Sequence, residues 1–285
     1  MVFPLPRTLA ALRVAREAAQ TIRRAGRPRR IRLKSSAADL VTATDLRVEK
    51  LVRAWLSSHY PQDAVVGEEG GGLAELDLRR PTWFVDPLDG TTNFAHGLPH
   101  YACAIAFWDG EQLALGVVAD ATRRRTYWAE AGRGAYEGRK RLQVSDTRTL
   151  GRSVIATGFP PSRATDPDNN LAEFLSVVND TRDVRRLGCA GIDLSWVAAG
   201  RLDAYWEQRC GPWDWAPGAI LVREAGGRAS TFDGTDWKPG DGELVASNGA
   251  IHDRLLRSFA QARAGAGLPA RPIAESTRPQ FGSSP

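Results

Sequence analysis

The stretch WFVDPLDGTTNFAHG, residues 83–97, limits the fold more than any other part of the chain. Its apolar start is typical of a short buried strand, which runs directly into two carboxylates, Asp86 and Asp89. Proline and Asp-Gly are ordinary turn residues, so the stretch alone could be only a turn. Ligand sites in open α/β sheets, however, usually lie at strand ends. We therefore expect a strand that leaves the core at a candidate site.

Helical and strand patterns alternate along the rest of the chain and predict a mixed α and β (α+β) fold. Two apolar runs around Asp109-Gly110 predict a β-hairpin. Helical spacing of apolar residues predicts helices over residues 8–25, 46–58, 169–180, 190–200 and 214–225, and a last helix that ends near residue 262. We expect an N-terminal α+β half over 1–150, a C-terminal α/β half over 151–263, and a disordered tail over 264–285, which is rich in Gly, Pro and Ser.

The composition is that of a soluble globular protein: 42% of the 285 residues are hydrophobic and 25% are charged. No apolar run approaches the roughly 20 residues that span a bilayer, and no signal peptide is expected. The three cysteines are widely spaced and include no CxxC pair. They fit a reducing cytoplasm better than a disulfide framework, so we expect a cytoplasmic protein without membrane partners.

The basic residues are unevenly distributed, although the net charge is only +5. Only four of the 38 are lysines, which indicates genome composition before it indicates a nucleic-acid surface. The densest run, RRAGRPRRIR over Arg23–Arg32, fits a solvated helix end, where arginines complement the helix dipole. The alternative is a patch that attracts phosphorylated ligands or RNA.

Acidic residues recur where a strand or loop meets a helix. Singly, each has an ordinary explanation as a helix cap, a turn residue or a solvated acid. Together, converging carboxylates repel one another and imply a counter-charge. Oxygen ligands without a His or Cys cluster point to Mg²⁺, with Mn²⁺ or Ca²⁺ as weaker fits. The residues concerned are Asp45, Glu68, Glu69, Asp86, Asp89 and Asp214.

The Gly-Thr-Thr that follows Asp89 supplies a candidate anion cradle. Gly90 allows close approach of the backbone, and the N–H groups of Gly90, Thr91 and Thr92 can face a phosphate if a helix begins there. Carboxylates that can bind a metal ion, next to backbone amides that can bind a phosphate, predict a phosphatase.

Four motifs together resemble the inositol monophosphatase family of Mg²⁺-dependent, lithium-sensitive sugar phosphatases. They are LKSSAADLVTATD, GEE, WFVDPLDGTTNFAHG and WDWAPGAILVREAGG, and the resemblance runs from about residue 8 to residue 262. It implies the layered αβαβα sandwich of the sugar-phosphatase superfamily (the inositol monophosphatase and fructose-1,6-bisphosphatase type), usually as a homodimer.

The resemblance also implies the metal ligands, carried over by position. Glu68, Asp86 and the backbone carbonyl of Leu88 would hold a first Mg²⁺, and Asp86, Asp89 and Asp214 a second. Asp86 would therefore bridge two ions that clamp the phosphate.

A third, weaker Mg²⁺ would lie near Glu68, on the Asp45 side. Thr91 and Asp45 resemble the family's threonine–aspartate pair, in which the aspartate accepts a hydrogen bond from the threonine hydroxyl, so that the hydroxyl orients the attacking water. Asp45, Thr91 and Glu68 are thus the expected catalytic residues.

The expected substrate contacts follow from the same resemblance. Asp89 and the amides of Gly90 and Thr91 would contact the phosphate end. Glu207 would accept hydrogen bonds from ring hydroxyls. The loop Gly188, Cys189 and Ala190 would line the sugar site, with cysteine where relatives carry threonine, which puts a side-chain contact there in doubt. Lys34 and Glu69 are further candidates.

His96 and His100 are expected to be structural, because oxygen-rich Mg²⁺ sites seldom use imidazole. The leading function is hydrolysis of inositol 1-phosphate or a similar polyol phosphate. Alternatives on the same fold are histidinol phosphate, fructose 1,6-bisphosphate or a 3′-phosphonucleotide as substrate. An alternative of another class is an RNA- or transcription-associated binding protein that uses Arg23–Arg32.

Overall fold

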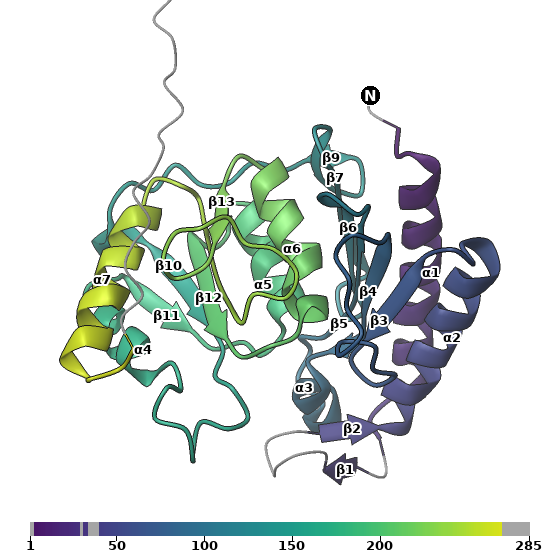
Figure 1. Cartoon of the computed structure of the whole chain (residues 1–285), viewed down its shortest axis with the longest axis horizontal. Helices are drawn as coiled ribbons and strands as arrows, with labels where there is room; N and C mark the ends of the chain where they lie inside the picture. The colour runs from purple at the N-terminus through teal and green to yellow at the C-terminus, as the bar shows by residue number, and fades with distance from the viewer. Residues whose placement is uncertain (1–2, 29–30, 34–39, 270–285) are drawn as a thin grey trace, which may run out of the picture.

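The protein is a stack of five layers, as its computed structural model shows (Figure 1). The structure describes residues 3–28, 31–33 and 40–269. From right to left in Figure 1, the layers are a helical pair, a large sheet, a second helical pair, a smaller sheet and a third helical pair. This arrangement confirms the predicted αβαβα sandwich.

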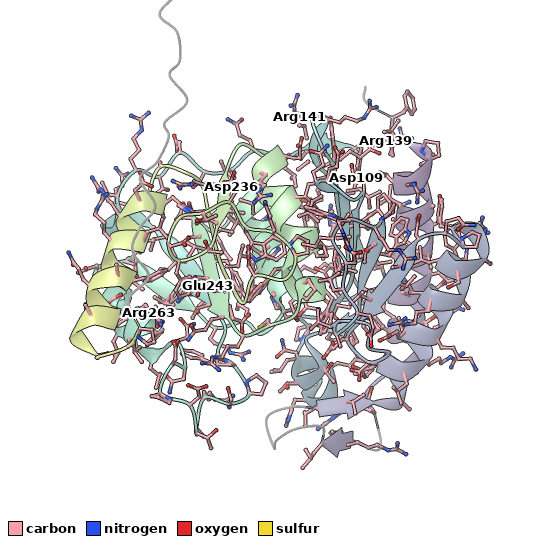
Figure 2. All side chains as sticks on the ribbon, in the orientation of Figure 1. Asp109, Arg139, Arg141, Asp236, Glu243 and Arg263 are labelled. Atoms are coloured by element: carbon pink, nitrogen blue, oxygen red, sulfur yellow. The ribbon has the colours of Figure 1, made fainter. Side chains whose placement is uncertain are left out.

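The larger sheet has seven strands among the described residues, in the order β3-β4-β5-β6-β7-β8-β9. β3 is parallel to β4, and every later neighbour is antiparallel. The predicted hairpin is confirmed: β5 and β6 pair on either side of the turn that carries Asp109 (Figure 2). The strands are β3 (Ala64–Gly67), β4 (Thr82–Asp89), β5 (Ala102–Trp108), β6 (Leu113–Asp120), β7 (Arg125–Glu130), β8 (Gly134–Glu137) and β9 (Lys140–Arg141).

The smaller sheet has the order β11-β10-β12-β14-β13 in the described part of the chain. β10 is parallel to both β11 and β12, whereas β14 is antiparallel to β12 and β13. Its strands are β10 (Val154–Thr157), β11 (Asp183–Arg185), β12 (Ala204–Gln208), β13 (Arg228–Ser230) and β14 (Glu243–Ser247). The large sheet ends before residue 150 and the small one begins after it; the domain boundary itself stays a prediction.

The helices form the other three layers. α1 and α2 cover the outer face of the large sheet, α5 and α6 lie between the sheets, and α4 and α7 cover the outer face of the small sheet. The described helices are α1 (Pro6–Ala25), α2 (Ala43–His59), α3 (Thr91–His96), α4 (Leu171–Val178), α5 (Ala190–Ala198), α6 (Pro212–Glu224) and α7 (His252–Gly265), with a 3₁₀ turn, η1, at Leu150–Arg152.

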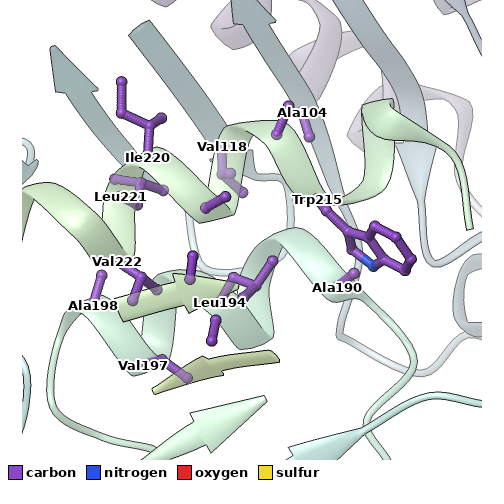
Figure 3. Close-up of a cluster of buried hydrophobic side chains, with 14 of the residues drawn as sticks. Ala104, Val118, Ala190, Leu194, Val197, Ala198, Trp215, Ile220, Leu221 and Val222 are labelled. Atoms are coloured by element: carbon purple, nitrogen blue, oxygen red, sulfur yellow. The ribbon is translucent and has the colours of Figure 1, made fainter. Parts of the chain in front are cut away.

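The middle helices α5 and α6 are apolar on nearly every side, because each packs against a sheet and against the other. Figure 3 shows Leu194 of α5 and Ile220 of α6 among the buried side chains between the sheets. The two helices approach so closely at Gly218 that a Cβ there would overlap Leu194. No helix of the described residues combines the length and apolarity that crossing a membrane requires.

Three local features differ from the predictions. α2 begins at Ala43 rather than near residue 46, and Thr42 is its N-cap, whereas Asp45 lies in the first turn. The antiparallel pair β1 (Ile31–Leu33) and β2 (Leu40–Thr42) was not predicted, because three-residue strands give no clear alternation. α7 continues to Gly265, three residues past the expected end. The rest of the expected tail, residues 270–285, lies outside the described residues.

Candidate active site

The site is built on an irregularity in β4. Asp86 pairs with Ala104 of β5 and Asp89 with Ala102, so β4 has one extra residue between the two aspartates. Pro87 lies in this interval and cannot donate a ladder hydrogen bond, which favours such a bulge. The N–H of Leu88 donates to Asp86 Oδ1 over 2.9 Å, and all of β4 is buried. The bulge thus places two buried carboxylates at the end of the strand.

Gly90 turns the chain from β4 into α3. Its φ of +89° is left-handed, and a Cβ would lie 2.8 Å from the carbonyl oxygen of His100. Only glycine fits both conditions. A short helix begins at Thr91, as the anion cradle requires; phosphate binding by these amides stays a prediction.

Asp45 and Thr91 come together as the resemblance implies. Thr91 Oγ1 lies 2.7 Å from Asp45 Oδ1 and 2.9 Å from the carbonyl oxygen of Leu88, so its one proton can be donated to either. The other oxygen of Asp45 accepts the N–H of Thr42 at 2.9 Å and the Thr42 hydroxyl. Asp45 therefore stabilises the first turn of α2 and holds Thr91 at the same time.

The remaining acids influence one another electrostatically. Burial raises the pKa of Asp86 well above its usual value, and Glu68, Asp89 and Asp214 add to the rise. Burial likewise raises the pKa of Asp214, with further contributions from Glu68 and Asp89. Like charges that raise one another's pKa values are close neighbours in a poorly solvated region. The four acids predicted as metal ligands therefore share one electrostatic environment.

Hydrogen bonds within the protein orient several of these oxygens. The N–H of Gly211 donates to Asp214 Oδ2 over 2.7 Å, as that of Leu88 does to Asp86. Among the described residues, no group of three or more His, Cys, Asp or Glu side chains already has the spacing to hold a metal ion. Metal ligation by Glu68, Asp86, Asp89 and Asp214 therefore stays a prediction, whose support is their shared environment.

Asp89 connects β4 to the first turn of α5. Its Oδ1 accepts the N–H of Ala190 at 3.1 Å, and its Oδ2 accepts the N–H of Gly191 at 2.6 Å and the thiol of Cys189 at 3.1 Å. A carboxylate at a helix N-terminus is favourable, but burial still raises the pKa of Asp89 to about 6. The Cys189 thiol therefore donates to Asp89 within the protein, and its contact with a substrate stays a prediction.

A cavity of about 170 Å³ opens beside these acids, and most of the predicted substrate residues line it, whereas Gly90 and Thr91 do not. Glu207 is 8% exposed and accepts a hydrogen bond from the Tyr205 hydroxyl. Burial raises the pKa of Glu207, against the effect of Tyr205 and Arg186. A Cβ on Gly158 would overlap the Glu207 carboxylate, so glycine keeps room for it. The predicted residues on the wall are Asp89, Gly188, Cys189, Ala190, Glu207 and Asp214.

Two polar contacts near the cavity were missed from the sequence. His100 Nε2 lies 2.8 Å from Asp193 Oδ1, and Asp193 lines the cavity. This contact agrees with a structural role for His100. Asn93 donates to the carbonyl oxygens of His100 and Leu187, each over 2.8 Å. It therefore connects α3 to the loop before α5, which lines the cavity. Asn93 lies within the motif TTNF, but nothing local to the sequence indicated its partners.

Other candidates lie apart or cannot be placed. The backbone N–H of Glu69 donates to Glu49 Oε2 over 2.7 Å, and Glu69 lines an open groove on α2 rather than the cavity. Lys34 lies outside the described residues. From the Arg23–Arg32 run, Arg27 Nε donates to the carbonyl oxygen of Ala95 at the end of α3, over 3.0 Å.

Comparisons with known proteins agree with this geometry. The family described as the inositol monophosphatase family matches residues 5–264. The chain is 40% identical over 236 residues to an inositol-1-monophosphatase of Synechocystis sp., covering 82% of each protein. It is 42% identical over 226 residues to the Nus factor SuhB of Pseudomonas aeruginosa, covering 78% of this chain and 83% of the relative.

Solved structures show the same fold. An inositol monophosphatase from Anabaena superposes with a TM-score of 0.79 at 36% identity, covering 89% of this chain and 95% of that one. The Thermotoga maritima IMPase superposes with a TM-score of 0.83 at 28% identity, covering 92% and 100%.

Proposed function

This chain belongs to the inositol monophosphatase family, a family of phosphoric monoester hydrolases, and we propose that it hydrolyses inositol 1-phosphate or a similar polyol phosphate with the help of Mg²⁺. The observation that carries the proposal is the contact of the Thr91 hydroxyl with both Asp45 and the Leu88 carbonyl, beside four electrostatically linked acids. The thiols of Cys103, Cys189 and Cys210 are not candidate nucleophiles, because burial raises their pKa values and keeps them protonated. Water is the proposed nucleophile.

The donor set fits a hard cation. Every candidate ligand presents oxygen, and the buried carboxylates need positive charge to remain ionised together. One Mg²⁺ would be held by Glu68, Asp86 and the Leu88 carbonyl. A second would be held by Asp86, Asp89 and Asp214, and a third would bind more weakly. Mn²⁺ can replace Mg²⁺. When bound, Mg²⁺ lowers the pKa of its water and offsets the charge of the phosphate.

The chain's own residues then orient the reactants. When the Thr91 hydroxyl donates its hydrogen bond to Asp45 Oδ1, a lone pair of Thr91 Oγ1 is free to accept a hydrogen bond from the attacking water. Asp45 cannot turn away, because Thr42 holds its second oxygen. The amides of Gly90 and Thr91 contact the phosphate, and Glu207 with the loop Gly188–Ala190 contacts the polyol hydroxyls.

The test is a comparison of threonine variants. Thr91→Val removes the hydroxyl at nearly constant volume and lowers kcat about a hundredfold or more, the size expected for loss of proton-transfer assistance. Thr91→Ser restores most of the rate. Thr21→Val is the control, because the Thr21 hydroxyl bonds only to its own helix at Glu17. Phosphate release from inositol 1-phosphate at saturating Mg²⁺ is the readout, and a fully active Thr91→Val overturns the proposal.

The proposal extends to a homodimer in the cytoplasm. The three cysteines are free, which suits a reducing compartment. A second candidate role is a contact with RNA or the transcription machinery through Arg23–Arg32, supported by the relative named Nus factor SuhB and by the exposure of Arg24, Arg27 and Arg32. RNA retention that is unchanged after these arginines are neutralised would exclude them as the site of such a contact.

A further inference from the structure

We propose that Glu49 of α2 is a positioning residue: its carboxylate fixes the loop that carries Glu68 and thereby sets how tightly the protein binds Mg²⁺. The inference rests on the proposed function, because it takes Glu68 as a metal ligand. It goes beyond that function by giving a role to a side chain that is not among the described residues lining the cavity.

The loop that carries Glu68 has little to stiffen it from within. Four of the six residues 67–72 are glycine, and Gly71 and Gly72 have left-handed φ angles of +70° and +100°. Glycine-rich backbone loses more conformational freedom than any other when it is held in one conformation. The N–H of Glu68 donates to the carbonyl of Val85 on β4 over 3.2 Å, and β3 itself ends one residue earlier. Beyond Glu68, the loop therefore needs partners outside the sheet.

The Glu49 carboxylate supplies these partners. Its Oε2 accepts the N–H of Glu69 at 2.7 Å, and its Oε1 accepts the N–H of Gly70 at 2.6 Å. A Cβ on Gly70 would lie 2.3 Å from Oε1, and a Cβ on Gly67 would lie 2.5 Å from it, so the loop backbone rests directly on the carboxylate. Glu49 is 3% exposed. The two N–H groups that follow Glu68 are thus fixed by one buried side chain.

Arg53, one turn further along α2, completes the arrangement. Its Nε donates to Glu49 Oε1 over 2.6 Å, which balances the charge of the buried carboxylate. Its Nη1 donates to the carbonyl of Val65 over 3.0 Å, and its Nη2 donates to that of Gly71 over 2.8 Å. Arg53 therefore holds the chain on both sides of Glu68, while Glu49 holds it directly after Glu68.

The same face of α2 also holds Thr91. Asp45 and Glu49 are four residues apart, so their side chains are neighbours on the helix. Asp45 accepts the Thr91 hydroxyl, and α2 packs against β4. A single turn of one helix therefore sets the place of Thr91 and that of the Glu68 loop together. Groups that orient metal ligands in this way commonly change metal affinity 10- to 100-fold when they are removed.

The experiment measures Mg²⁺ binding to metal-free protein by calorimetry. Glu49→Gln keeps the size of the side chain, but its amide nitrogen cannot accept a backbone N–H. The dissociation constant for Mg²⁺ is expected to rise roughly tenfold, while kcat with inositol 1-phosphate at saturating Mg²⁺ stays close to that of wild type. Hydrogen exchange adds a readout without metal or turnover: the amides of Glu69 and Gly70 should exchange faster in the variant.

Glu224→Gln is the matched control. The Glu224 carboxylate accepts the N–H groups of Gly132 and Gly134 at 2.8 Å and 2.7 Å, so it fixes the turn between β7 and β8 as Glu49 fixes the Glu68 loop. The control should leave the dissociation constant for Mg²⁺ unchanged, although the amides of its own turn exchange faster. Equal weakening of Mg²⁺ binding in both variants would reflect a general loss of stability and would overturn the positioning role.

Arg53→Lys decides the question if Glu49→Gln does not fold. Lysine keeps a positive charge beside Glu49 but cannot reach the carbonyls of Val65 and Gly71 with a planar fork. The dissociation constant for Mg²⁺ should rise about threefold, as expected for one hydrogen bond. Unchanged Mg²⁺ affinity in a folded Glu49→Gln variant, or in Arg53→Lys when the first does not fold, would overturn the inference.

The outcomes also separate this inference from the proposed function. Mg²⁺ affinity that depends on Glu49, in a protein that hydrolyses no phosphomonoester, would support the positioning role and contradict the proposed function. Hydrolysis of inositol 1-phosphate by a protein whose Mg²⁺ affinity is independent of Glu49 would contradict the positioning role alone.

Discussion

The thiol of Cys189 donates a hydrogen bond to Asp89 Oδ2 over 3.1 Å, so a sulfur atom helps to orient a candidate metal ligand. Cys189 is also the N-cap of α5, a position that serine favours. The residue thus has a structural and a site-orienting role at once.

Cys189→Ser is expected to keep or raise stability and to retain activity, because a hydroxyl supplies the same hydrogen bond. Cys189→Ala removes the donor and should lower the free energy of unfolding by about 1 kcal/mol. Urea unfolding and kcat/KM with inositol 1-phosphate measure the two effects. Identical behaviour of the serine and alanine variants would show that the donor is unimportant.

Asp86→Asn is expected to separate stability from activity. Burial and the charges of Glu68, Asp89 and Asp214 raise the pKa of the Asp86 carboxyl, so its ionised form is unfavourable in the folded protein. Asparagine carries no charge, and the metal-free variant should therefore be at least as stable as wild type at neutral pH. Catalysis and the rise in Tm on adding Mg²⁺ should both be lost. Thermal unfolding with and without Mg²⁺ checks this; an Mg²⁺-induced rise in Tm that is unchanged in the variant would contradict the ligand assignment.

His252 is expected to make the protein sensitive to acid. Burial lowers its pKa to about 3, and its two ring nitrogens lie 2.8 Å and 2.9 Å from the hydroxyls of Ser230 and Ser247. Between pH 6.5 and 3 the unfolded chain binds the proton and the folded chain does not. The contribution of His252 to stability therefore falls as pH drops below about 6.5, by up to about 1.4 kcal/mol per unit, whereas the raised pKa values of Asp89 and Asp193 act in the opposite direction.

Two measurements check the His252 prediction. Urea unfolding between pH 7.5 and 5 gives the slope of the free energy of unfolding against pH, and NMR of the imidazole ring reports the charge of His252. Ring signals that titrate near pH 6.5 in the folded protein would contradict it.

Arg263 on α7 (Figure 2) is expected to hold the loop between β10 and α4, residues 158–170, part of which lines the cavity. It is 1% exposed and bonds to both oxygens of Asp168, at 2.8 Å and 2.9 Å, and to Glu173 Oε1 at 2.6 Å. Asp168 also accepts from Gln208, the residue after Glu207. Arg263→Met leaves buried carboxylates without their cation, so it should cost about 3 kcal/mol of stability and raise KM more than it lowers kcat.

The matched control is the exposed pair of Arg228 with Asp253, which also involves α7. Arg228→Gln should change stability by about 1 kcal/mol or less and leave KM unaltered. Urea unfolding and Michaelis–Menten kinetics at a temperature where both variants are folded provide the readouts. A KM for Arg263→Met equal to that of wild type would limit Arg263 to a structural role.

The family resemblance of the sequence motifs predicted the layers correctly, whereas local patterns predicted the fine geometry less well. Apolar periodicity located most of the helices, and the family motifs carried the candidate residues. The local pattern placed Thr44 and Asp45 at the cap of α2. Both residue types suit that position, and only the hydrogen bonds identify Thr42 as the cap.

Contacts between distant segments could not be predicted from local patterns. The partner of His100 is Asp193, which is 93 residues away in the chain, and the partner of Asp168 is Arg263, which is 95 residues away. Periodicity describes which face of an element is buried, but not which polar side chain of another element meets it.

The place of α6 between the two sheets has a consequence for biosynthesis. A helix that packs against a sheet on each side cannot reach its final position until both sheets have formed. β13 and β14 of the smaller sheet leave the ribosome after α6. Asp214, on the first turn of α6, therefore reaches Asp86 only late in synthesis. With Asp214 as a proposed metal ligand, the nascent chain is expected to have no phosphatase activity until nearly all of it has been translated.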